Sequence, residues 1–195
     1  MLLVKNQRIP GRKHWIRRLA KELNGKRKEI ERDIRAKLQL IKHQIAGGIE
    51  SEIVVWVIHE KLACAQRPLR YHPQFGGHNP LPSQARPLVV KWVNRIKNMG
   101  FRSIICMLEV RQLDRYYMRG GINLHEKGLL GYYKSHGFRV YHFPMTDYQK
   151  PQESSMGKIL LAYDEFPKPV LLHCSAGIDR SAPVAAYIAL NQRNV

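Results

Sequence analysis

The sequence predicts an α/β fold: a central, mainly parallel sheet of about five strands flanked by helices, with a basic helical extension at the N-terminus. From residue 51 onward, short runs of β-branched and aromatic residues alternate with longer segments of helical periodicity. Strands that alternate with helices in this way form parallel sheets. Lys and Arg are concentrated before residue 46, which sets that segment apart. We therefore expect a basic helical extension over residues 1–50 and one globular domain over residues 51–195.

Residues 14–46 carry apolar side chains at near-helical spacing with charged residues between them, which predicts an amphipathic helix or a pair of helices. Asn24-Gly25 is the expected break, and Gly47-Gly48 the expected end. We expect the basic residues to form a solvated face of helices packed on the domain. An anionic lipid or a nucleic acid is the alternative partner for this face.

The remaining elements follow in order along the chain. A β-branched and aromatic run at residues 53–58 predicts a strand, with residues 61–65 as its hairpin partner. The Pro-, Gly- and His-rich residues 67–87 predict a long surface loop. Further helices are expected at residues 88–99, 125–135, 155–166 and 181–191, and further strands at residues 103–108, 138–143 and 169–173.

Charge and cysteine content indicate the kind of partner and the environment. The 33 Lys and Arg against 15 Asp and Glu give a formal net charge of +18, which predicts an acidic substrate or partner. Cys64, Cys106 and Cys174 match neither a disulfide framework nor a zinc site, and so indicate a reducing compartment. Because no secretory signal and no membrane-spanning apolar run is evident, we expect a cytoplasmic protein without a transmembrane segment.

The segment from Cys174 to Arg180 has the composition of a phosphate-binding loop. It lies between a predicted strand and a predicted helix, at the edge of an α/β sheet where ligands bind. Small residues allow such a loop to curl, so that its amides converge on one anion, and an arginine adds a bidentate donor. The same positive surroundings stabilise a thiolate, which makes Cys174 a candidate nucleophile. The expected phosphate-binding residues are Ser175, Ala176, Gly177, Ile178, Asp179 and Arg180.

The run from His173-Cys174 to Arg180-Ser181 resembles the signature of the protein tyrosine phosphatase superfamily, in which His-Cys is followed by five residues and then Arg and Ser or Thr. The resemblance to the dual-specificity-like branch covers about residues 53–190. It implies a hydrolase that forms a cysteinyl-phosphate on Cys174 and needs no metal or other cofactor. It further implies that Ser181 eases departure of the sulfur, with a helix cap as the alternative, and that His173 orients the loop.

Cleavage of a phosphate ester also needs a proton donor for the leaving oxygen. Asp147 is our candidate, because it follows a predicted strand and precedes Cys174, where the family's general acid would fall. Asp179 is the alternative donor, although we expect it to cap the loop or to form a salt link from outside. Cys106 is expected near Cys174, either as a small buried hydrophobe or as its redox partner.

The loop departs from the most common pattern of the family, because Asp179 stands where many relatives have Gly and Ala182-Pro183 follows Ser181. An acid before the Arg also occurs in members that hydrolyse phosphoinositides. The leading expectation is a protein tyrosine or dual-specificity phosphatase acting on a phosphorylated protein. The alternatives are a phosphoinositide or RNA 5′-phosphate phosphatase, and a non-catalytic module that binds phosphate or nucleic acid.

Overall fold

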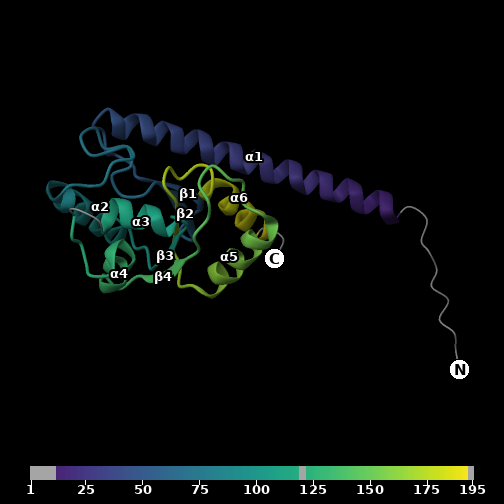
Figure 1. The fold of residues 1–195 in the computed structure, drawn as a ribbon. Helices are drawn as coiled ribbons and strands as arrows, with labels where there is room; N and C mark the ends of the chain where they lie inside the picture. Colours follow the sequence, from purple (N-terminus) through teal and green to yellow (C-terminus); the bar gives the residue numbers. More distant parts are fainter. Residues whose placement is uncertain (1–11, 119–121, 193–195) are drawn as a thin grey trace, which may run out of the picture.

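The structure is a computed structural model that describes residues 12–118 and 122–192, with side chains described from residue 17 onward. A five-stranded sheet in the order β1-β2-β5-β3-β4 forms its centre (Figure 1). β1 and β2 pair as an antiparallel hairpin, and all other neighbours are parallel. The predicted α/β fold with a mainly parallel sheet is therefore confirmed. The strands are β1 (Val54–Ile58), β2 (Leu62–Ala65), β3 (Ser103–Cys106), β4 (Arg139–His142) and β5 (Val170–His173).

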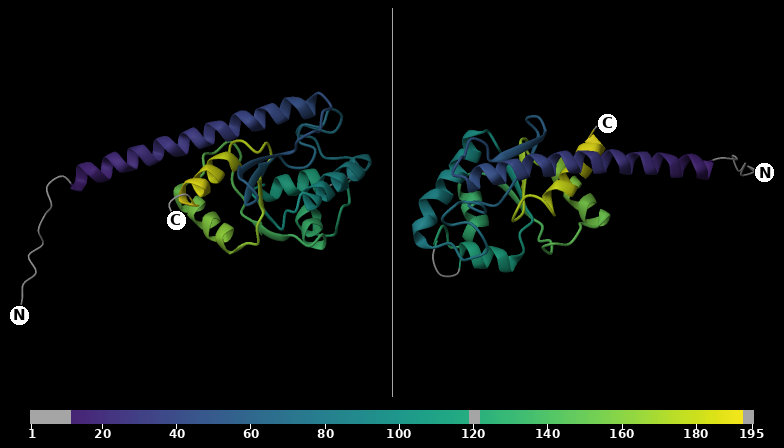
Figure 2. Two further views of the ribbon diagram at one scale, coloured as in Figure 1. Left: turned by 180° about the vertical axis from the view of Figure 1, so that it is seen from behind. Right: turned by 90° about the horizontal axis from the view of Figure 1, so that it is seen from above.

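Helices cover both faces of the sheet. In Figures 1 and 2, α5 and α6 lie on one side of the strands, and α2, α3 and α4 lie on the other. Four of these helices match the predicted ones within a few residues at each end. The two-turn helix α3 was not predicted. The helices are α2 (Arg86–Asn98), α3 (Val110–Tyr117), α4 (Gly128–Ser135), α5 (Glu153–Glu165) and α6 (Ser181–Gln192), with a short 3₁₀ turn η1 (Ser83–Ala85) before α2.

The N-terminal segment forms one continuous helix, α1 (Arg12–Ala46), so the expected break at Asn24-Gly25 is wrong. A glycine inside a helix costs only about 1 kcal/mol relative to alanine, and the apolar stripe of α1 continues on the same face beyond Gly25. The helix ends where predicted, because Gly48 has a φ of +81°, a left-handed conformation that favours glycine.

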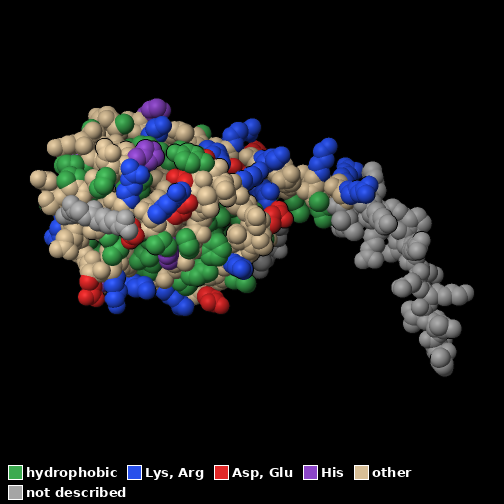
Figure 3. Space-filling view, in the orientation of Figure 1, with side chains coloured by type: hydrophobic (Ala, Val, Ile, Leu, Met, Phe, Trp, Pro, Cys, Tyr) green, Lys and Arg blue, Asp and Glu red, His purple; other side chains and the backbone are tan. Residues whose placement is uncertain are grey.

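The C-terminal half of α1 packs on the domain, whereas its N-terminal half extends beyond it (Figure 1). The buried side chains are between 2% and 4% exposed and belong to the same hydrophobic cluster as the sheet. Lys and Arg side chains lie along the extending part (Figure 3). The proposed division at residue 50 remains a prediction, and residues 1–11 of the expected extension lie outside the described residues. The buried residues of α1 are Ile34, Leu38, Ile41 and Ile45.

The register of the sheet brings several loops to one edge. His173, the last residue of β5, pairs with Ala65 of β2 and with Cys106 of β3, and Cys106 pairs with His142 of β4. The parallel strands therefore end level with one another. The segments that follow them begin side by side, at the edge where ligands of α/β proteins bind.

Candidate active site

The loop that begins at Cys174 is fastened to the end of β2. The amide of Arg67 donates a hydrogen bond to the carbonyl oxygen of Ser175 at 3.0 Å. Gly177 has a φ of +80°, and a Cβ at this position would lie 2.9 Å from the carbonyl oxygen of Ala65. Only glycine satisfies both conditions, so this residue allows the loop to curl tightly against the sheet. Cys174 itself is 1% exposed.

The donors of the loop are free to hold an anion. Within the described part of the chain, the amides of residues 175–179 donate no hydrogen bond. The hydroxyls of Ser175 and Ser181 and the Nε of Arg180 are buried, and they too have no partner among the described residues. Buried polar groups in native proteins almost always have a partner, and successive unpaired amides in a tight loop form a concave anion site. The loop therefore has the geometry and the free donors that a phosphate requires.

The Arg180 side chain is fully buried at the edge of the sheet. Its Nη1 donates to the carbonyl oxygens of Met107 and Met145 and to the Oε1 of Gln112, each at 3.0 Å. Its Nη2 lies 2.8 Å from the Oδ1 of Asp147. The structure thus brings together two residues that are 33 positions apart in the sequence and that we predicted to share one site.

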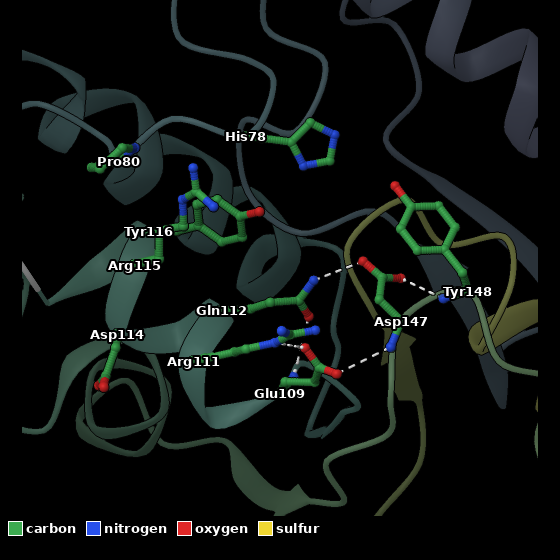
Figure 4. A pocket seen from close by; sticks show the side chains of 10 residues that line it. All are labelled: His78, Pro80, Glu109, Arg111, Gln112, Asp114, Arg115, Tyr116, Asp147 and Tyr148. Carbon is green, nitrogen blue, oxygen red and sulfur yellow. Dashed lines mark hydrogen bonds and ion pairs between the residues drawn. The ribbon is translucent and has the colours of Figure 1, made fainter.

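Asp147 is held by hydrogen bonds with the start of α3 and with the adjacent Tyr148 (Figure 4). Its Oδ2 accepts a hydrogen bond from the Nε2 of Gln112 at 2.8 Å, and its Oδ1 accepts one from the amide of Tyr148 at 3.2 Å. Its own amide donates to the Oε1 of Glu109 at 3.2 Å. Gln112 therefore bridges Asp147 and Arg180, since its amide group contacts both side chains.

Glu109 and Gln112 were not predicted as site residues. They form a reciprocal capping box at the start of α3, which fixes both side chains. A hydrogen bond from Arg111 lowers the pKa of Glu109, although its partial burial opposes this shift. The sequence did carry a signal, because Glu109 and Gln112 have the spacing of a capping box ahead of apolar residues at helical spacing.

His173 lies beneath the loop, fully buried. Its Nε2 is 3.3 Å from the hydroxyl of Tyr133, and its Nδ1 is 3.4 Å from the carbonyl oxygen of Cys174. Burial lowers the pKa of His173 to about 4, and the nearby Arg180 acts in the same direction. A neutral imidazole therefore lies between Tyr133 of α4 and the first residue of the loop, and its role in orienting the loop remains a prediction.

Cys64 and Cys106 are buried and free, as is Cys174. Burial raises the pKa of Cys64, and it raises the pKa of Cys106 to about 12; the nearby Cys174 adds to both shifts. Both thiols are thus unreactive as nucleophiles near neutral pH. The expected burial of Cys106 is confirmed, whereas a disulfide with Cys174 remains a prediction.

A cavity of about 530 Å³ lies beside Asp147 (Figure 4). One wall carries His78, whose Nε2 is 3.0 Å from the Nη2 of Arg70. Another wall carries Tyr116, and the Cζ of the fully buried Arg67 lies 3.7 Å from the centroid of its ring. The charge of Arg70 lowers the pKa of His78, with smaller effects from burial and from Arg67 and Arg115. Asp147 acts in the opposite direction, and the cavity lining combines Arg111 and Arg115 with Glu109 and Asp114.

Neither a metal site nor a membrane-spanning helix is evident in the described part of the chain. No group of three or more His, Cys, Asp or Glu residues in residues 12–118 and 122–192 is arranged to hold a metal ion. Likewise, no helix within these ranges is long and apolar enough to cross a membrane.

No protein-family model and no curated sequence matches the chain. Among solved structures, it resembles Tk-PTP in its active form, with a TM-score of 0.51 and 17% identity over 74% of this chain and 77% of the other. A glycine-to-alanine form of Tk-PTP matches with a TM-score of 0.50 and 19% identity, over 73% of this chain and 74% of that one. Kinase associated phosphatase, with its catalytic cysteine replaced by serine, matches with a TM-score of 0.50 and 22% identity, over 67% of this chain and 65% of the other. The chain thus shares the fold of these solved structures.

Proposed function

We propose that this chain, which has the fold of the protein tyrosine phosphatase superfamily, hydrolyses phosphate monoesters through a cysteinyl-phosphate on Cys174. The observation that carries the proposal is the arrangement at the carboxyl edge of the sheet. Cys174 opens a loop of unpaired amides, the loop ends in the buried Arg180, and Arg180 lies 2.8 Å from the carboxylate of Asp147. A nucleophile, an anion cradle and a proton donor therefore meet in one place.

Substrate binding exchanges one anion for another at Arg180. Without substrate, the guanidinium group of Arg180 holds the carboxylate of Asp147. When substrate binds, the phosphoryl oxygens accept hydrogen bonds from this guanidinium group and from the loop amides. A dianionic phosphate competes with that carboxylate and releases it toward the leaving oxygen. Gln112, which contacts both Arg180 and Asp147, keeps the released carboxyl group nearby.

The chemistry follows in two displacements. The Cys174 thiolate attacks phosphorus, the bond from phosphorus to the leaving oxygen breaks, and that oxygen takes the proton of Asp147. Water then attacks the phosphocysteine and gives a proton back to the Asp147 carboxylate. The bond from phosphorus to sulfur breaks, and the thiolate leaves with a hydrogen bond from the unpaired hydroxyl of Ser181.

A phosphorylated protein is the substrate that we favour, with phosphotyrosine first and phosphoserine or phosphothreonine also considered. The leaving group departs on the side of Asp147, and the cavity there has room for an aromatic ring. The formal net charge of +18 also supports a second candidate, a phosphoinositide or RNA 5′-phosphate phosphatase, because bulky polyanions need basic surroundings. Three free cysteines are consistent with action in a reducing compartment such as the cytoplasm.

Turnover of a small aryl phosphate under reducing conditions tests the proposal. We expect the wild type to be active and Cys174→Ser to be inactive. Lack of turnover by the wild type would contradict the proposal. A panel of phosphopeptides, phosphoinositides and 5′-phosphorylated RNA, compared at one salt concentration, then separates the substrate classes, since polyanion binding depends steeply on salt.

A further inference from the structure

A residue of the N-terminal helix contacts the phosphate loop from outside. The Nη1 of Arg35 on α1 lies 3.1 Å from the Oδ1 of Asp179, which directly precedes Arg180. The Nε and Nη2 of Arg35 each lie 2.9 Å from the Oε1 of Glu31, one turn earlier on the helix. Glu31 thus holds one edge of the guanidinium group, so that its other nitrogen is directed at the loop.

The backbone that carries Arg35 is firmly held. Ile34 and Leu38 flank it on α1, and they are 2% and 4% exposed within the hydrophobic cluster of the domain. α1 crosses the domain beside α6, the helix that begins at Ser181, immediately after the loop (Figure 2). The position of Arg35 relative to the loop is therefore set by packing that does not depend on the ion pair.

The ion pair contributes little to stability but constrains the loop. The Arg35 and Asp179 side chains are 35% and 43% exposed, and such pairs contribute about 0–1 kcal/mol to folding. The first half of the loop is anchored on β2, by the hydrogen bond to Ser175 and by the fit of Gly177. The carboxylate of Asp179 provides the corresponding contact for the second half, to Arg35 of α1.

We propose that Arg35 is a positioning residue of the active site, whose ion pair with Asp179 holds the second half of the phosphate loop, and with it Arg180, in the phosphate-binding conformation. The proposal rests on the proposed function, and it gives α1 a part in catalysis in addition to folding. It also assigns Asp179 the role of an anchor, leaving proton donation to Asp147.

The test compares Arg35→Ala, Asp179→Ala and the double variant on one aryl phosphate at fixed pH and salt. Small misplacements of catalytic groups lower rates by up to about 100-fold, so we expect kcat to fall about 10- to 100-fold in each. KM should rise by a smaller factor than kcat falls, because the loop amides still hold the phosphoryl group. The kcat of the double variant should be no lower than that of either single variant, because all three variants break the same contact. Arg35→Lys should recover part of the loss.

Arg27→Ala is the matched control. Arg27 also joins α1 to the domain, with its Nη1 3.0 Å from the Oε1 of Glu153 on α5, but it does not touch the loop. We expect its kcat to equal that of the wild type. An equal loss in Arg27→Ala and Arg35→Ala would overturn the proposal, because the effect would then be helix docking. An unchanged kcat in Arg35→Ala, or a rise in KM alone, would overturn it as well.

Tungstate affinity, measured by calorimetry on the full chain, separates this proposal from the proposed function. Tungstate imitates a phosphoryl group, and we expect Arg35→Ala and Asp179→Ala to bind it more weakly than the wild type and Arg27→Ala do. If the wild type binds tungstate and the two variants bind it less, but no ester is hydrolysed, the proposed function fails and the positioning role stands. If the wild type hydrolyses esters and the variants match it in rate and affinity, only the positioning role fails. A wild type that neither binds tungstate nor hydrolyses esters contradicts both.

Discussion

The protonation of His173 provides a quantitative test of how the loop is supported. His173 is fully buried beneath Cys174, and its burial lowers its pKa to about 4 from an unfolded value near 6.5. The unfolded chain therefore binds a proton more readily than the folded protein does. The contribution of neutral, buried His173 to the free energy of unfolding is therefore fully present above pH 6.5 and is lost as the pH falls from 6.5 toward 4.

The size of the effect follows from the two pKa values. Between pH 7 and pH 5 at 25 °C, the difference between about 4 and 6.5 removes about 2 kcal/mol from the free energy of unfolding. This is a large share of the roughly 5–15 kcal/mol that stabilises a typical domain.

Urea unfolding of the wild type and of His173→Gln at pH 7 and pH 5 measures the stability lost through protonation of His173. The glutamine side chain is polar but does not titrate in this range. Losses that arise from other groups should be common to both proteins, so the wild type should lose about 2 kcal/mol more than the variant. Equal losses in the two proteins would refute the account of His173 as a neutral, buried support of the loop.

Three further predictions concern the acid, the loop and the helix. Asp147→Ala should lower kcat about 100- to 1,000-fold for an alkyl phosphate, because its leaving oxygen needs a proton, and much less for a nitrophenyl phosphate. If Asp179→Ala shows this dependence on the leaving group and Asp147→Ala does not, Asp179 is the general acid. Gly177→Ala should lower the free energy of unfolding by about 1–3 kcal/mol in a denaturant titration, because the φ of +80° and the carbonyl of Ala65 oppose a Cβ. The control is Gly25→Ala, because Gly25 faces open space on α1, and this substitution should raise the free energy of unfolding by about 1 kcal/mol or less. Similar effects of the two substitutions would contradict the conclusion that the loop requires glycine at position 177. Deletion of residues 1–46 should prevent folding, as measured by circular dichroism. The deletion removes four buried side chains, each of which contributes about 1.5–3 kcal/mol to stability. If the remaining chain is folded and active, α1 is not needed for folding.

The sheet and the phosphate loop could be predicted because their signals are local. The strands coincide with short apolar runs, which are richest in β-branched residues at β1 and β3, and the loop has its small residues, cysteine and arginine within seven consecutive positions. Asp147 could be proposed from its place after a strand, since the ends of parallel strands meet at one edge.

The partners of these residues could not be predicted, because their roles arise from contacts between distant segments. The capping-box spacing of Gln112 indicates only a helix start, and its role in the site depends on contacts with Asp147, 35 positions later, and Arg180, 68 positions later. Arg67 and Arg35 are two of 33 basic residues. No local pattern distinguishes the fully buried Arg67, or the Arg35 that reaches the loop, from those on the surface.

The expected break in the N-terminal helix failed for a different reason. Asn24-Gly25 is a helix-breaking pair by local propensity. The preference is weak, however, and the burial of residues farther along the same helix, such as Ile34 and Leu38, outweighs it. A helix-breaking preference of about 1 kcal/mol predicts a helix end only where tertiary packing does not oppose it.

The covalent intermediate is the most direct test of the central claim. Wild-type protein mixed with an aryl phosphate and quenched in acid within milliseconds should yield a peptide containing Cys174 that carries one added phosphoryl group in mass spectrometry. The intermediate should accumulate in Ser181→Ala, in which departure of the sulfur is slowed, and it should be absent from Cys174→Ser. Steady turnover in Cys174→Ser, or turnover of the wild type with the phosphoryl group on another residue, would contradict the account.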